Sequence, residues 1–154
     1  MSELYKTYAA LVLEPGGVWH GESPLHVTLG QPTAMSATRL AEFITLLRVD
    51  LHDFGPVSVT GTEEDWFGPT CEDRVRRVAH TAELLYLHEL ILDAQRELDA
   101  DLVVMYPDFN PHATSKTHLA LREYQRLECG EVGILQKPDD TTWRKVATIP
   151  LLEE

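Results

Sequence analysis

Two short segments, His26–Thr28 and His112–Thr114, carry residue types whose spacing could do chemistry. Each is a His-x-Thr triplet, and the first lies within the strand-like run Leu25–Leu29. Side chains alternate between the two faces of a strand, so the histidine and threonine of each triplet project from the same face. If the two strands lie side by side, two imidazoles and two hydroxyls converge on one cleft.

This set of groups is suited to cleaving a phosphodiester without a metal. A neutral imidazole can accept the proton of the nucleophile, while an imidazolium donates a proton to the leaving oxygen. The threonine hydroxyls can donate hydrogen bonds to phosphoryl oxygens as charge develops there. We therefore predict that His26, Thr28, His112 and Thr114 are catalytic. The alternative is that each pair only stabilises its strand.

Three further residues are candidates for binding a substrate. Tyr8 precedes the first triplet on an apolar run, and Trp143 stands just before the last expected strand, so either ring could stack on a nucleobase. Lys116 follows the second triplet and could neutralise a phosphate. Each has an ordinary alternative: the aromatic rings could belong to the core or to a sheet edge, and the lysine could be a solvated strand residue.

The remaining histidines and the basic residues suggest no other chemistry. His112 and His118 could share a zinc ion, but no cysteine or acidic residue stands at a customary ligand spacing. His88 falls near the apolar face of a helix and is expected to be partly buried. Alternation places Arg77 on the opposite face from Arg74 and Arg76, so only part of this basic cluster could serve a ligand. Glycine-rich phosphate loops are absent, and we predict no metal and no cofactor.

The elements that must position these groups follow from apolar periodicity. A serine cap and apolar residues at helical spacing predict one helix from Ser36 to about Val49, and a longer periodic run predicts another over about 82–98. The segment Thr62–Pro69 is expected to be irregular. Strands are expected at Tyr8–Leu13, Leu25–Leu29, Pro56–Thr60, Val75–Ala79, the second triplet, about 131–135 and about 143–151. This order predicts a single α+β domain over residues 1–154, with hints of two similar halves.

Charge and composition limit the partners. Thirteen lysines and arginines against 25 aspartates and glutamates give 154 residues a formal charge of −12. Such a surface repels long DNA or RNA and acidic membranes, yet it permits a small nucleotide in a locally basic cleft. Cys71 and Cys129 form no disulfide framework, and the sequence has neither a signal-peptide pattern nor an apolar stretch long enough to span a membrane. We therefore expect a cytoplasmic protein; its oligomeric state is open.

The sequence resembles the 2H phosphoesterase superfamily, which includes bacterial 2′-5′ RNA ligase-like proteins. LHVTLG at 25–30 resembles that family's first motif, and FNPHAT at 109–114 resembles its second, in which Phe and Pro precede the histidine. The second motif departs from the pattern because Ser115 and Lys116 follow where an apolar residue is usual. The resemblance implies a bilobed, pseudo-twofold α+β fold, with antiparallel sheets around a central cleft and flanking helices.

The resemblance also implies a metal-independent phosphodiesterase acting on 2′,3′-cyclic phosphates, 2′-5′ linkages or cyclic oligonucleotides. The negative charge favours a small cyclic nucleotide or oligonucleotide over long RNA. One compact branch of the superfamily comprises phage enzymes that destroy the cyclic oligonucleotide messengers of bacterial CBASS defence, and this chain is similar to it in size and layout; a phage enzyme would act in the host cytoplasm. Two alternatives stay open: an RNA-end 2′,3′-cyclic phosphodiesterase or 2′-5′ ligase, and a module that sequesters a nucleotide without cleaving it. Which histidine is the acid, and whether water or a ribose hydroxyl attacks, also stays open.

Overall fold

A computed structural model describes residues 4–13, 24–68, 70–99, 102, 109–115, 120–139 and 142–151. Within these ranges the chain forms two helices and eight strands. The helices are α1 (Ala37–Asp50) and α2 (Ala82–Leu98). The strands are β1 (Tyr5–Val12), β2 (His26–Met35), β3 (Val57–Phe67), β4 (Asp73–Val78), β5 (His112–Thr114), β6 (Arg126–Cys129), β7 (Glu131–Lys137) and β8 (Arg144–Pro150). None of the helices in this described part is long and apolar enough to cross a membrane.

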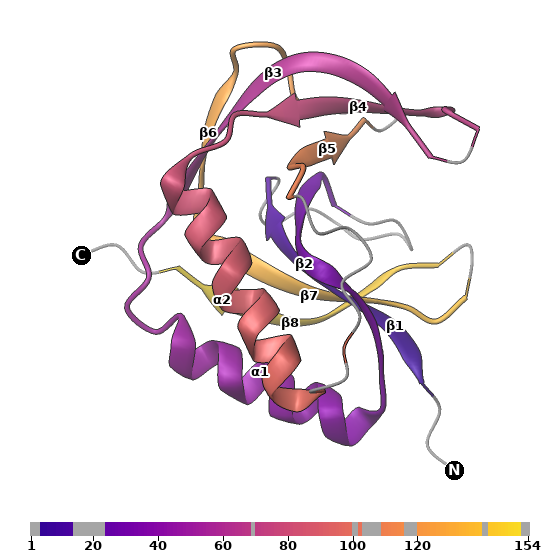
Figure 1. Cartoon of the computed structure of the whole chain (residues 1–154), viewed down its shortest axis with the longest axis vertical. Helices are drawn as coiled ribbons and strands as arrows, with labels where there is room; N and C mark the ends of the chain where they lie inside the picture. The colour runs from indigo at the N-terminus through magenta and orange to yellow at the C-terminus, as the bar shows by residue number, and fades with distance from the viewer. Residues whose placement is uncertain are drawn as a thin grey trace.

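The strands form one curved antiparallel sheet in the order β6-β3-β4-β5-β2-β1-β7-β8. Both helices run along the same side of this sheet (Figure 1). The apolar residues of α1 and α2 join those of the sheet in one main core, which includes Phe43, Leu47 and Ile91. The α+β class and the flanking helices are therefore confirmed. The strands share one continuous sheet where separate sheets were predicted, because β2 and β5 pair with each other at its centre.

Both helices begin where local hydrogen bonding favours it. The Ser36 side chain accepts a hydrogen bond from the Arg39 amide of α1, and the Thr81 side chain accepts one from the Leu84 amide of α2. These caps satisfy amides that the first turn of a helix leaves unpaired. The predicted cap at Ser36 is confirmed, and the predicted helix boundaries agree with the structure to within about one residue.

The sequence prediction of an irregular segment was wrong for Thr62–Phe67, because β3 continues as a strand to Phe67. This outer part of β3 is rich in acidic residues and pairs with the basic strand β4, so that Glu64 lies opposite Arg76 and Trp66 opposite Arg74. Cross-strand pairs of opposite charge stabilise a ribbon that has no apolar alternation to indicate it. Strand β6 was also missed, since its four residues RLEC alternate but form a run too short to predict a strand alone.

A bulge in β2 shapes the inner end of the sheet. Thr7 and Ala9 of β1 pair with Thr33 and Leu29 of β2, so three residues of β2 stand opposite a single residue of β1. Gly30 adopts a φ of 61°, and a side chain there would meet Gln95 of α2. A glycine at this position lets the chain leave the ladder and lie directly against the helix.

The bulge takes backbone amide and carbonyl groups of β2 out of the pairing with β1. Two side chains of α2 form hydrogen bonds with these groups instead. The His88 Nδ1 accepts a hydrogen bond from the Gly30 amide at 3.1 Å. The Gln95 Oε1 accepts one from the Gln31 amide, and its Nε2 donates to the Gln31 carbonyl at 2.6 Å. His88 and Gln95 are both buried, and they lie two turns apart on one face of α2. The helix therefore holds the bulge in one conformation.

We expect the substitution Gln95→Ala to destabilise the fold by about 2–3 kcal/mol, because it leaves a buried amide and a buried carbonyl of the bulge unpaired. Thermal or urea unfolding measures this loss. The matched control is Glu97→Ala, an exposed position on the same helix, which should change the unfolding free energy by less than about 0.5 kcal/mol. Equal stabilities of the two variants would contradict the role given to Gln95.

Candidate active site

Strands β2 and β5 bring the two His-x-Thr triplets together. Val27 pairs with Ala113 in an antiparallel register, and both residues are fully buried in the core. Their neighbours in the two triplets therefore project from the opposite face of the sheet. The same register sets His26 across from Thr114 and Thr28 across from His112. The four residues predicted to be catalytic thus share one surface, where each histidine faces the threonine of the other triplet.

Both imidazoles are held in the same way. The Nδ1 atom of His26 lies 2.7 Å from the Pro24 carbonyl oxygen, and the Nδ1 of His112 lies 2.8 Å from the Asn110 carbonyl oxygen. A carbonyl oxygen only accepts, so Nδ1 carries the proton in each ring. Nε2 is then the atom that can take up or release a proton. The residue two positions before each histidine fixes this tautomer.

Aromatic rings flank His26. The Trp143 ring centroid lies 6.2 Å from that of His26 and 4.8 Å from that of Tyr8. The amine of Lys137 lies 5.4 Å from the Trp143 ring centroid, and that of Lys6 lies 5.6 Å from the Tyr8 ring. The two aromatic residues predicted to bind substrate therefore form a tilted pair beside one histidine, with cations close to both rings.

His112 has a different set of neighbours, centred on Arg77. Arg77 lies directly across from His112 in the pairing of β4 with β5, so both side chains share a face. The guanidinium contacts the Asp65 carboxylate at 2.6 and 2.7 Å, and it donates to the Asn110 side-chain oxygen at 2.7 Å. It also lies over the Phe67 ring, which makes an edge contact with the His112 ring at 4.6 Å. Asp65 and Arg77 therefore brace both the ring of His112 and the residue that fixes its tautomer.

The surroundings of His112 lower its pKa below the ordinary value of 6.5. Burial is the largest cause, because it disfavours the charged imidazolium. The hydrogen bond to the Asn110 carbonyl raises the pKa, and the nearby positive charge of Arg77 lowers it. The net effect keeps the His112 ring neutral at pH 7, with Nε2 able to accept a proton.

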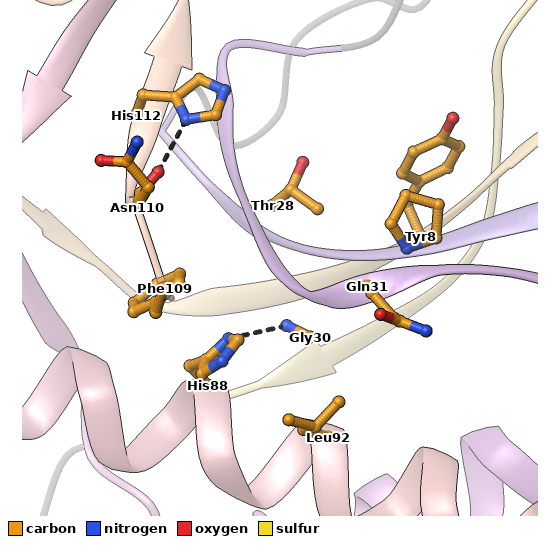
Figure 2. Close-up of a pocket in the computed structure, with 10 residues that line it drawn as sticks. Tyr8, Thr28, Gly30, Gln31, His88, Leu92, Phe109, Asn110 and His112 are labelled. Carbon is orange, nitrogen blue, oxygen red and sulfur yellow. Dashed lines mark hydrogen bonds between the residues drawn. The ribbon is translucent and has the colours of Figure 1, made fainter. Parts of the chain in front are cut away.

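A cavity of about 240 Å³ opens next to these groups (Figure 2). It runs from Thr28 and His112 to the β2 bulge and the buried face of α2. Its lining residues come from β1, β2, α2 and the segment before β5: Tyr8, Thr28, Gly30, Gln31, Pro32, His88, Leu92, Phe109, Asn110 and His112. Two of the four catalytic candidates, Thr28 and His112, therefore line this cavity, while His26 and Thr114 lie outside its lining.

The remaining sequence predictions concern Lys116, a zinc site, His88 and the basic cluster of β4. Lys116 and His118 lie outside the described residues. The part of the chain that the structure describes holds no group of three His, Cys, Asp or Glu side chains that could bind a metal ion. His88 is buried, as predicted, and only Arg77 of the basic cluster shares the face of His112.

Several residues at this site escaped the sequence analysis. Asp65 and Phe67 were placed in an irregular segment, so nothing indicated that Phe67 contacts His112 or that Asp65 contacts Arg77. Arg77 was correctly assigned to the opposite face from Arg76, but only the strand register shows that this face carries His112. Phe109 and Asn110 belong to the FNPHAT motif, which is the one signal that could have singled them out.

No protein-family model and no curated protein sequence matches this chain. Solved structures do match its fold. LigT of E. coli, in a crystal structure with 3′-AMP, superposes with a TM-score of 0.68 and 13% identity over 98% of this chain and 100% of LigT. A protein of Thermus thermophilus superposes with a TM-score of 0.70 and 17% identity over 95% and 97% of the two chains.

A third structure, described only as a phosphoesterase, gives a TM-score of 0.67 at 12% identity over 97% of this chain and 99% of its own. Further crystal structures of E. coli LigT contain ATP, phosphate or NADP+. These likenesses extend over nearly the whole of each chain, at identities that establish the architecture alone. The chain therefore has the fold of LigT and of this phosphoesterase.

Proposed function

We propose that this chain is a metal-independent phosphodiesterase that hydrolyses a small cyclic nucleotide or cyclic oligonucleotide. The observation that carries the proposal is the pairing of β2 with β5, which sets two histidines and two threonines on one face. Both histidines have Nδ1 on a backbone carbonyl, so both present Nε2 for proton transfer. The fold shared with LigT and with a structure described as a phosphoesterase also supports the proposal.

His112 is the general base in this proposal, and His26 is the general acid. The lowered pKa of His112 keeps its Nε2 unprotonated at pH 7, so it takes the proton of the attacking hydroxyl or water. The attacking oxygen forms its bond to phosphorus as the bond to the leaving oxygen breaks. The leaving oxygen takes the proton of the His26 imidazolium, while Thr28 and Thr114 donate hydrogen bonds to the non-bridging oxygens. Proton exchange with solvent then returns His112 to its neutral form and His26 to its imidazolium form.

Three observations favour a small nucleotide as the substrate. The net charge of −12 disfavours long RNA. The aromatic pair Tyr8–Trp143 stands beside His26, with Lys6 and Lys137 near its rings to offset phosphate charge. Structures of E. coli LigT contain 3′-AMP, ATP and NADP+, all of them small adenine nucleotides. A phage enzyme that removes a cyclic immune messenger in the cytoplasm of its host is the biological setting that we propose.

Chromatographic product analysis tests this function. The protein is incubated in EDTA with 2′,3′-cyclic mononucleotides, cyclic dinucleotides and cyclic trinucleotides, beside a His26→Ala control. We expect linear products from at least one cyclic oligonucleotide, undiminished by EDTA and lost in the control. Turnover of the mononucleotides alone would indicate RNA-end processing. Binding without any product would identify a sequestering module and refute the proposal.

A further inference from the structure

We infer that the cavity between the β2 bulge, α2 and Phe109 binds one nucleobase of the substrate whose phosphate lies at the two histidines. This inference rests on the proposed function and adds a separate subsite to it. Thr28 and His112 line the outer end of the cavity, so a ligand could reach both places at once (Figure 2). His88 and Leu92 of α2 line the opposite, inner end (Figure 2).

The walls of the cavity are chemically suited to an uncharged ring. Pro32, Leu92 and Phe109 provide apolar surface, and Gly30 adds backbone without a side chain. None of the lining residues, all of them described by the structure, is a lysine or an arginine. A phosphate would lose its hydration there without gaining a cation, whereas a nucleobase would bury apolar ring surface.

His88 keeps this end of the site rigid and uncharged. Its ring lies parallel to that of Phe109, with centroids 4.0 Å apart and an angle of 10° between the planes. Its Nδ1 accepts the Gly30 amide, which requires the unprotonated form of that atom. Burial lowers the pKa of His88, so this form prevails at neutral pH. The Phe109 ring is therefore held in a fixed orientation at the cavity wall.

One polar group in the wall is also fixed in orientation. The Asn110 side-chain oxygen accepts a hydrogen bond from Arg77 at 2.7 Å, which defines the orientation of the amide and makes Nδ2 its donor end. This contact holds Asn110, and with it the neighbouring Phe109, in place at the rim of the cavity. The sugar and phosphate would then extend from the rim toward Thr28 and His112.

The size of the cavity limits its occupant to one base. At about 240 Å³ it falls below the roughly 300–1,000 Å³ typical of sites that enclose a drug-sized ligand. A single heteroaromatic ring system fits such a space, but a cyclic di- or trinucleotide does not. The remaining nucleotides of a larger substrate would therefore lie outside it, on the side of His26 and Trp143.

A binding experiment separates this subsite from catalysis. We would measure the affinities of 3′-AMP and of ribose 3-phosphate, which lacks the base, by calorimetry. Leu92→Phe fills the inner end of the cavity, and Leu85→Phe makes the same change on the exposed side of α2. We expect Leu92→Phe to weaken 3′-AMP about tenfold and to leave ribose 3-phosphate unchanged. Leu85→Phe should change neither affinity.

A loss of affinity for both ligands in Leu92→Phe, or for neither, would overturn the subsite. If the Leu92→Phe variant does not fold, nuclear Overhauser measurements on the unmodified protein with 3′-AMP test the same subsite. Nuclear Overhauser contacts are expected between the adenine protons and the Leu92 methyl groups; contacts to Trp143 alone would place the base elsewhere. Failure of the proposed hydrolysis would appear separately, as absence of product in the substrate panel while the base still contributes to binding.

Discussion

Replacing His112 by alanine is expected to lower kcat/KM for the cyclic substrate about 10²–10⁴-fold, because the reaction loses its proton acceptor. The affinity for the substrate should change far less, since the cavity and the rings beside His26 remain. Steady-state kinetics on the best substrate of the product panel, together with a binding measurement, provide the test. Removing His26 should have an effect of similar size through loss of the acid.

The double variant His26→Ala/His112→Ala should be little worse than either single variant, because residues that act as a unit are not additive. His52 offers a matched control. Its Nδ1 also lies on a backbone carbonyl, that of Val49, but the side chain is exposed after the end of α1. His52→Ala should retain full activity. Unchanged turnover in His112→Ala would refute the assigned role.

The sequence was sufficient to predict the parts of this fold that depend on local chemistry. Ser36 begins α1 because a side-chain oxygen can satisfy a helix amide, and the apolar spacing of Leu84, Leu87 and Ile91 indicates the buried face of α2. The His-x-Thr triplets were found because two-residue alternation is a property of any strand. These features require no knowledge of which strands become neighbours.

The parts that failed depend on contacts between distant segments. Glu64 and Asp65 carry charges typical of a loop, and they form a strand because β4 supplies arginines opposite or beside them. The sharing of one face by Arg77 and His112 depends on a strand register that a single sequence does not specify. The bulge after Thr28 depends in the same way on side chains of α2, 58 and 64 positions along the chain.

The unequal surroundings of the two histidines have a consequence for the pH dependence of the reaction. In the proposed reaction His112 can act as a base only when neutral, so activity should rise as the pH increases through its pKa. Burial and Arg77 lower that pKa, which places the acidic limb of the pH profile below the ordinary value of 6.5. Removing the positive charge of Arg77 should raise the pKa and move the limb to higher pH.

Arg77→Met is therefore expected to reduce kcat by up to about fourfold more at pH 6 than at pH 8, since the guanidinium lowers the pKa of His112 while burial still lowers it in the variant. Loss of the contact that braces Asn110 should slow the reaction at both pH values. Arg77→Lys keeps the charge but loses the paired contact with Asp65, so it should slow the reaction without moving the acidic limb. Arg74→Met, at an exposed position on the same strand, is the matched control. A limb that stays in place in Arg77→Met, or that moves to lower pH, would show that Arg77 does not act on the protonation of His112.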